Sequence, residues 1–245
     1  MRYLFEVSYF GENYSGWQRQ PNAPSVQQEL EDAISTILRK KTSIVGSGRT
    51  DTGVHAIQQF FHLDLKTDAS DLKYKLNSFL PDDIAILGHR EIKRDAHARF
   101  SATSRSYEYR INLAKDPFTV GRSYFLKKEV DIDLMNEAST ILVGEHDFKS
   151  FSKVKTDVKN YICDLKAAHW HEEKDHLFFY VTANRFLRGM VRALVGTLLL
   201  VGEGKIDLNE FAGIVGKKNR KAAGQNVPAC GLYLTNISYP EDIYL

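Results

Sequence analysis

Segments with strand-like and helix-like periodicity follow one another in an order that occurs twice along this chain of 245 residues. Alternating or β-branched stretches, and stretches with apolar residues three and four positions apart, predict strand, helix, strand, strand, helix, strand in each half. The second half repeats this order without repeating the sequence. Two such units predict an α+β fold of tandem ferredoxin-like (β-α-β-β-α-β) halves. We expect domains over residues 1–103 and 104–245, with a site in the cleft between them.

The expected elements follow from the periodicity and from helix start and stop signals. Ser25, followed by Gln28, resembles a capping box at the start of the first helix, and Pro81 stops the second. Strands are expected at Tyr3–Tyr9, Lys41–Ser47, Gln58–Leu65, Ile84–Glu91, Ser106–Leu113, Tyr161–His171, Leu177–Ala183 and Leu232–Tyr239. Helices are expected at Val26–Leu38, Asp71–Leu80, Asp133–Val143, Asn184–Val201 and Leu208–Val215.

Composition and charge are those of an ordinary globular protein. Hydrophobic residues make up 43% and charged residues 26% of the sequence, which excludes intrinsic disorder and collagen-like repeats. No apolar run reaches the roughly 18–20 residues of a membrane span, and no signal peptide is expected because the N-terminus opens on a strand-like segment. The only cysteines are Cys163 and Cys230, so we expect a cytoplasmic protein without a disulfide scaffold. The net charge of +2 neither requires nor excludes nucleic acid.

The most unusual segment runs from Gly46 to Ala56 and joins two expected strands. Its glycines allow positive φ angles and the close approach of a ligand. Asp51 lies two residues from Arg49, and a carboxylate beside a cation stays ionised. Such a carboxylate can act as a nucleophile or as a base. A tight loop with a surface ion pair explains the same spacing, so the spacing leaves both interpretations open.

A second unusual feature is the expected helix Asn184–Val201, in which Arg185, Arg188 and Arg192 fall within about 60° of arc. The remaining positions are apolar on nearly every side, which is typical of a buried helix. A buried guanidinium requires a carboxylate or phosphate partner, and Arg192 is the deepest candidate. A solvent-facing stripe of ordinary arginines is the alternative.

Basic residues also form clusters that aromatic residues interrupt. The basic residues are Arg90, Lys93, Arg94, Arg99, Arg105, Lys149, Lys153, Lys155, Lys159, Lys217, Lys218, Arg220 and Lys221, and the aromatic residues include Phe100, Tyr107, Tyr109, Phe148 and Phe151. Phosphate contacts and stacking platforms suit looped RNA, although charge runs are more often solvated surfaces.

Other chemistries find little support in the sequence. His169 and His171 would share one strand face, but no third ligand follows at a recognisable spacing, so no metal site is expected. The glycine-rich segment lacks the ending of a P-loop, and no dinucleotide fingerprint is present. Ser47 and His55 lack the nucleophile elbow of hydrolases.

The segment Gly48–Ala56 reads GRTDTGVHA and resembles the catalytic motif GRTDAGVHA of the TruA-type tRNA pseudouridine synthases. The similarity extends over nearly the whole chain, in the family's order. The further matching blocks are Gly16–Gln20, Ser25–Gln27, Leu80–Ile84, His97–Thr103, Gly144–Phe148, Met190–Arg192 and Pro228–Leu234. Several matching blocks in the right order are far more specific than any single one.

The resemblance implies isomerisation of uridine to pseudouridine at positions 38, 39 and 40 of the tRNA anticodon stem-loop, by a homodimer that needs no cofactor. It implies a pseudouridine synthase fold with a central mixed, mainly antiparallel sheet. Asp51 matches the catalytic aspartate, Tyr107 the tyrosine that stacks on the flipped uracil, and Arg192 the basic residue that pairs with the aspartate. Further RNA contacts are expected at Arg19, Arg49, His55, Arg99 and Arg188.

The chain departs from the family's usual residues at Phe10, Thr52, Ala96 and Ala193, none of which removes a group that the chemistry requires. Two other function classes stay open. A non-catalytic RNA-binding protein would keep its function in an Asp51→Asn variant. A nucleoside hydrolase would release free uracil and generally needs two carboxylates, of which we identify one.

Overall fold

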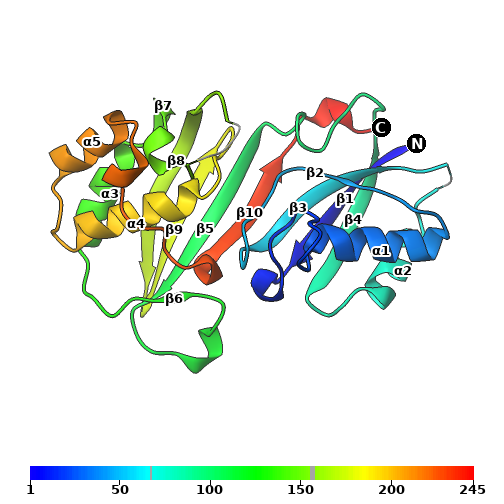
Figure 1. Cartoon of the computed structure of the whole chain (residues 1–245), viewed down its shortest axis with the longest axis horizontal. Coiled ribbons are helices and arrows are strands. Elements are labelled where there is room, and N and C mark those ends of the chain that lie inside the picture. Colours follow the sequence, from blue (N-terminus) through cyan, green and yellow to red (C-terminus); the bar gives the residue numbers. More distant parts are fainter. Residues whose placement is uncertain (67, 155–157) are drawn as a thin grey trace. The chain divides into compact units, whose positions relative to one another are not determined.

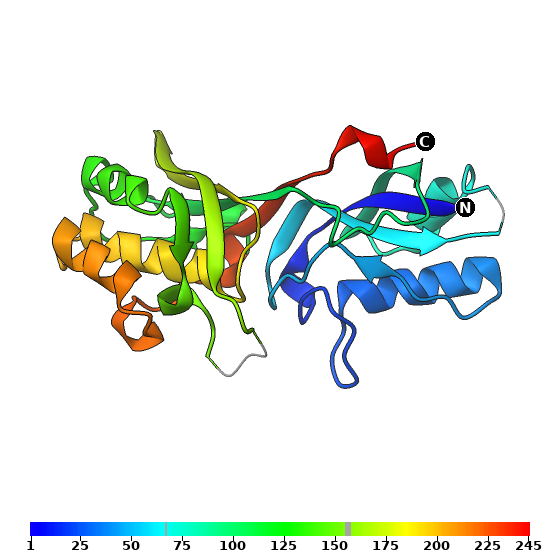
Figure 2. The ribbon, with the colours of Figure 1, turned by 90° about the horizontal axis from the view of Figure 1, so that it is seen from above.

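The computed structural model describes residues 1–66, 68–154 and 158–245, so Lys155 of the predicted basic clusters lies outside the described residues. The chain forms two compact units. Unit 1 comprises Met1–Ser104 and Tyr233–Leu245, and unit 2 comprises Arg105–Leu232. Both chain ends therefore belong to unit 1 (Figure 1, Figure 2). From the sequence we expected Tyr233–Leu245 in the C-terminal domain, and the position of the domain boundary stays a prediction.

Unit 1 is a sheet with the strand order β4-β1-β3-β10. The central strand β1 (Arg2–Tyr9) pairs antiparallel with β3 (His55–Asp64) and β4 (Ile84–Ile92), and β10 (Leu232–Ser238) is parallel to β3. The short β2 (Val45–Gly46) pairs antiparallel with β3, with Val45 opposite His62. Two helices, α1 (Val26–Leu38) and α2 (Leu72–Phe79), contact each other, and α2 packs on β4.

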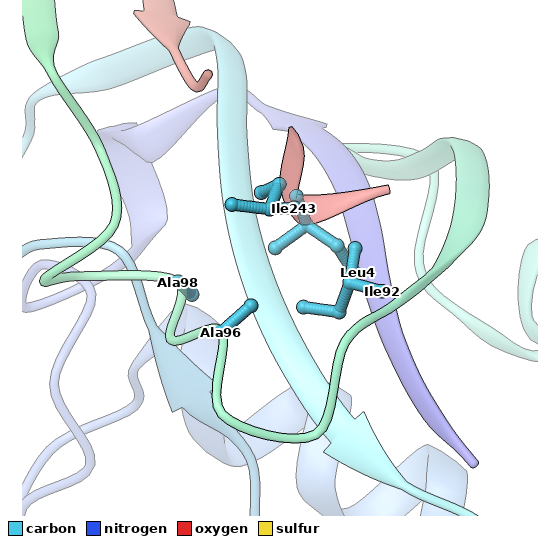
Figure 3. Packing of buried hydrophobic residues seen from close by; sticks show 5 residues of the cluster. All are labelled: Leu4, Ile92, Ala96, Ala98 and Ile243. Carbon is cyan, nitrogen blue, oxygen red and sulfur yellow. The ribbon is translucent and has the colours of Figure 1, made fainter. Parts of the chain in front are cut away.

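Apolar side chains pack on both faces of this sheet because successive strand residues point to opposite sides. Phe5 stacks on Phe61 with ring centroids 5.1 Å apart in the main core. The preceding Leu4 faces the other way, into a smaller cluster with Ile92 and Ile243 (Figure 3). Residues from both ends of the chain thus share one apolar cluster.

In unit 2, four strands pair antiparallel in the order β5-β9-β8-β7. Its strands are β5 (Ser104–Asn112), β9 (His176–Ala183), β8 (Ile162–Glu173) and β7 (Gly144–Asp147), and β6 (Tyr124–Phe125) adds in parallel to β5. Three helices pack with it, α3 (Ile132–Thr140), α4 (Met190–Gly202) and α5 (Leu208–Gly216). The α+β fold class is therefore confirmed.

Short 3-10 helices connect the main elements. They are η1 (Gly11–Asn13), η2 (Pro117–Thr119), η3 (Lys149–Phe151), η4 (Arg220–Ala222), η5 (Ala229–Gly231) and η6 (Glu241–Ile243).

Two expected elements differ from the structure by more than three residues at one end. The strand predicted at Lys41–Ser47 is reduced to Val45–Gly46. The backbone groups of Ile44 are hydrogen-bonded to the side chains of Gln27 and Glu31 on α1, so they cannot pair with another strand. The helix predicted at Asn184–Val201 begins only at Met190, after Gly189 with φ +71°. Arg185 and Arg188 therefore precede the helix, and the predicted stripe of three arginines along one helix is wrong.

Candidate active site

The loop that carries Asp51 connects β2 to β3 and is closed by its own turn. The backbone N–H of Val54 donates to the carbonyl of Asp51 at 3.1 Å, and Gly53 has φ +75°. The motif is therefore a backbone turn at the entry of β3, as its glycines suggested.

Segment 9–17 holds the backbone of this loop on both sides of Asp51. The N–H of Trp17 donates to the Thr50 carbonyl, and the N–H of Gly53 donates to the Tyr14 carbonyl, each at 3.2 Å. Gly16 has φ +88°, and a Cβ there would lie 2.4 Å from the Thr50 carbonyl oxygen. Glycine at position 16 allows segment 9–17 to contact the backbone of the Asp51 loop. The block that begins at Gly16 therefore packs directly against the segment Gly48–Ala56.

The buried Gln59 supports the loop from β3. Its Nε2 donates to the Gly48 carbonyl at 3.4 Å, and its Oε1 accepts a hydrogen bond from the Ser47 hydroxyl. A Cβ on Gly46 would lie 2.4 Å from Nε1 of the buried Trp17. These contacts fix the start of the loop as segment 9–17 fixes its end.

His55 is a packing residue in the described structure. It is 1% exposed, and its ring lies 4.3 Å from that of Phe10 and 4.7 Å from that of Tyr233, measured between centroids. Its Nδ1 accepts a hydrogen bond from the N–H of Gly11 at 2.9 Å. The ring is thus covered where we expected an RNA contact, and Phe10, a departure from the family pattern, supplies part of the cover. A pocket of about 460 Å³ opens beside these rings.

Two expected RNA contacts, Arg19 and Arg49, differ in their surroundings. Nη1 of Arg19 lies 3.1 Å from a carboxylate oxygen of Glu31 and 3.0 Å from one of Asp32. Arg49 is exposed, and its Nε donates to Oε1 of Gln18 at 3.0 Å. Arg19 is therefore engaged in ion pairs within unit 1, whereas Arg49 lies at the surface of the loop.

Arg99 lies on a separate exposed surface of unit 1. Its guanidinium carbon is 5.4 Å from the ring centroid of Phe100, which is 75% exposed, and the His97 ring is 4.5 Å from the same ring. Burial lowers the pKa of His97, and it lowers the pKa of the neighbouring His62 to about 4. The two imidazoles are therefore neutral at pH 7, and Arg99 supplies the positive charge beside Phe100.

Tyr107 lies on β5 of unit 2, opposite Val181 on β9. The ring of Phe186, which follows β9, meets it edge to face with centroids 5.1 Å apart. Such a contact fixes the plane of the tyrosine ring.

Arg192 lies in the first turn of α4 and is bound to the chain segment beside the helix. Its Nε donates to the Val227 carbonyl at 2.6 Å, and the N–H of Val227 donates back to the Arg192 carbonyl at 3.3 Å. A Cβ on Gly196 would lie 1.9 Å from the Gln225 carbonyl oxygen, so only glycine allows this approach. Arg188 is exposed, and its carbonyl accepts the N–H of Lys153.

The structure therefore brings Arg49, Asp51 and His55 together on one loop assembly of unit 1, and it places Arg188 and Arg192 near the start of α4 in unit 2. Asp51 belongs to unit 1 and Tyr107 to unit 2, so the pairing of Asp51 with Arg192 and the stacking by Tyr107 stay predictions.

Gln18, Gln27 and Glu31 were not predicted from the sequence as residues that support the loop. Gln27 and Glu31 are buried on α1, although both are polar. The signal was available, since they lie four residues apart beside the apolar positions Val26 and Leu30 and therefore share the inward face.

Within residues 1–66, 68–154 and 158–245, no group of three or more His, Cys, Asp or Glu side chains could hold a metal ion. In the same described parts of the chain, none of the helices has the length and apolar character needed to cross a bilayer.

Comparison with known proteins defines the class. The family described as tRNA pseudouridine synthase matches residues 6–101 and 138–240. The chain therefore belongs to the tRNA pseudouridine synthases, which isomerise uridine in tRNA to pseudouridine.

Relatives named tRNA pseudouridine synthase A match along the full length. The protein of Porphyromonas gingivalis is 46% identical, covering 100% of this chain and 99% of its own. That of Parabacteroides distasonis is 44% identical, covering 99% and 98%. That of Bacillus licheniformis is 39% identical, covering 98% and 99%.

Proposed function

We propose that the protein converts uridine to pseudouridine at positions 38, 39 and 40 of the tRNA anticodon stem-loop, with Asp51 as the catalytic carboxylate. The observation that carries this proposal is the anchoring of Thr50 and Gly53, on either side of Asp51, to segment 9–17. A carboxylate on a fixed backbone meets a flipped nucleotide without reordering of the loop, which favours catalysis.

The reaction breaks the N1–C1′ bond of the uridine, turns the uracil ring and joins C5 to C1′. The C5 hydrogen leaves as a proton and N1 gains a proton, so no electrons are gained or lost and the reaction needs no redox cofactor. Asp51 either attacks a carbon or removes the ribose 2′ proton, and both routes use its ionised form.

Tyr107 and Arg192 are proposed to complete the site. Flipping the uridine costs a few kcal/mol, and stacking on the Tyr107 ring offsets about 1–3 kcal/mol of it. Arg192 uses one of its guanidinium donors on Val227, and the fork of its remaining donors matches a carboxylate such as that of Asp51.

The tRNA is proposed to contact the exposed Arg49, Arg99 and Arg188 through its phosphates, so binding weakens as salt is raised. Arg19 and His55 are proposed to support the site from within unit 1, since one is ion-paired and the other is covered. Two copies of the chain are proposed to hold the tRNA, in the cytoplasm.

The test is release of tritium from tRNA transcripts that carry C5-tritiated uridine, with the wild type and Asp51→Ala in parallel. We expect release by the wild type alone, without free uracil. Tritium retained by both proteins that nevertheless bind tRNA would favour a binding module, and free uracil would indicate a hydrolase. Transcripts with uridine at only one of positions 38, 39 and 40 test the proposed positions.

A further inference from the structure

A chain of hydrogen bonds between side chains connects a buried carboxylate on α1 to the loop that carries Asp51. Nε of Arg49 donates to Oε1 of Gln18 at 3.0 Å. Nε2 of Gln18 donates to Oε1 of Gln27 at 2.6 Å, and Nε2 of Gln27 donates to Oε1 of Glu31 at 3.0 Å. We call these four residues the Glu31 relay. Every donor in it points toward Glu31.

The orientation of the Gln27 amide is fixed from both ends. Its Nε2 faces two acceptors, the Glu31 carboxylate and the Ile44 carbonyl at 3.3 Å. Its Oε1 faces the backbone N–H of Arg19, a donor, at 3.1 Å. A carboxylate only accepts and a backbone N–H only donates. Turning the amide over would break all of these bonds in a site where Gln27 is 9% and Glu31 6% exposed, so the alternative orientation is costly.

The orientation of Gln27 then decides that of Gln18. Since Gln27 presents an oxygen, Gln18 must present its amide nitrogen to it. The Gln18 oxygen is therefore the atom left facing Arg49, and an oxygen is what the Arg49 Nε–H needs. In the opposite orientation, Gln18 would present N–H groups to a guanidinium that has only donors.

We propose that Glu31 is a positioning residue for Arg49: through Gln27 and Gln18 it fixes Nε of Arg49, so that the terminal guanidinium nitrogens face a tRNA phosphate. This inference rests on the proposed function for the tRNA contact only, because the relay itself lies within unit 1. Successive hydrogen bonds that point the same way polarise one another, which strengthens the last bond of the relay.

Glu31 also pairs with Arg19, so a purely structural role in that ion pair must be separated from the relay. Asp32 provides the control, because it accepts from the same Nη1 of Arg19 at 3.0 Å. Its side chain is 58% exposed, whereas that of Glu31 is 8% exposed. Asp32→Asn therefore weakens the hold on Arg19 and leaves the four relay residues unchanged.

The first test needs no substrate and follows the Arg49 Nε–H signal by NMR, with Arg49→Lys for its assignment. Gln27→Met retains the length of the side chain and leaves both Gln18 and Arg49 in place, and Glu31→Gln removes the fixed acceptor. In both variants we expect the Nε–H to exchange with solvent about tenfold faster, the effect of losing one such hydrogen bond. The proposal is overturned if the Nε–H of Gln27→Met exchanges at the wild-type rate. It is also overturned if the Nε–H of Asp32→Asn exchanges as fast as that of Gln27→Met. If thermal melting shows that Glu31→Gln does not fold, the result with Gln27→Met decides the test.

The second test is a double-mutant cycle on tritium release. Gln27→Met is expected to lower kcat/KM about tenfold, mainly through a higher KM. It should have no further effect in an Arg49→Met background, because a positioning residue acts through its target. Additive losses would indicate a structural role and overturn the proposal. If the variants show the expected faster Nε–H exchange but the wild type releases no tritium, the proposed function fails and the positioning of Arg49 stands.

Discussion

The hydroxyl groups of Tyr9 and Thr50 lie 2.8 Å apart in the interior of unit 1, so the last residue of β1 is bonded to the residue directly before Asp51. The central strand of unit 1 thus helps to fix the position of the Asp51 loop. The same segment continues to Gly16, where it meets the loop backbone again.

Gly16→Ala should damage the loop. The new Cβ would sit at φ +88° and 2.4 Å from the Thr50 carbonyl oxygen. We expect a loss of about 1–3 kcal/mol in the free energy of unfolding, measured by urea denaturation, together with reduced tritium release. Gly48→Ala is the matched control, because a Cβ there meets nothing within 4 Å. Equal stability losses in the two variants would contradict this reading of Gly16.

Tyr107→Phe and Tyr107→Leu should separate stacking from the hydroxyl group. Phenylalanine keeps the ring against Phe186, so tRNA binding should stay within about twofold of wild type. Leucine loses the aromatic face and should raise the Kd by about 5- to 150-fold, the range that corresponds to one stacked base. Filter binding at fixed salt measures both, and a Kd that is equal in the two variants would show that the ring does not stack on the tRNA.

Arg192→Lys should reduce the rate although it keeps the positive charge. Lysine has no fork and cannot hold Val227 through Nε while meeting a carboxylate with two further donors. We expect kcat to fall about 10- to 100-fold, with little change in melting temperature. Retention of wild-type kcat would exclude the proposed pairing with Asp51.

Acid should destabilise unit 1 through His62. Its pKa is lowered to about 4, mainly by burial, from the value of 6.5 of an exposed imidazole. In the folded protein, its Nδ1 accepts a hydrogen bond from the N–H of Ala98, which requires the unprotonated nitrogen. The unfolded chain therefore binds the extra proton first, and stability that is fully present above pH 6.5 declines as the pH falls toward 4.

The urea midpoint measured between these pH values checks this prediction. In His62→Asn, an amide oxygen can still accept from Ala98 but does not titrate. The decline should therefore be shallower in that variant, and an equally steep decline would assign it to other groups, such as the neighbouring His97 and Asp64.

Much of unit 1 follows from local sequence signals. The helix Val26–Leu38 has the predicted bounds, because Ser25 accepts the N–H of Gln28 as its cap and the apolar spacing continues to the end. The sequence also indicated that the Asp51 loop needs glycine, and Gly53 has φ +75° there. The catalytic role of the loop stays a prediction.

The features that were not predicted depend on contacts between residues that lie far apart in the sequence. The strand expected at Lys41–Ser47 is displaced because Gln27 and Glu31, which no local pattern links to Ile44, bond to its backbone. His55 carries a motif position and a polar ring, yet Phe10 and Tyr233 cover it from remote parts of the chain. The apolar periodicity also continues before Met190, and nothing local showed that Gly189 takes a positive φ and delays the helix.

The division of the chain into units has a consequence for biosynthesis. Unit 2 is one continuous stretch, Arg105–Leu232, whereas unit 1 lacks β10 and Ile243 until Tyr233–Leu245 have been made. A nascent chain emerges from the ribosome N-terminus first. Unit 1 is therefore the first to be synthesised in part and the last to be completed. The contact of Tyr233 with His55, next to the Asp51 loop, forms only after Tyr233 has been made.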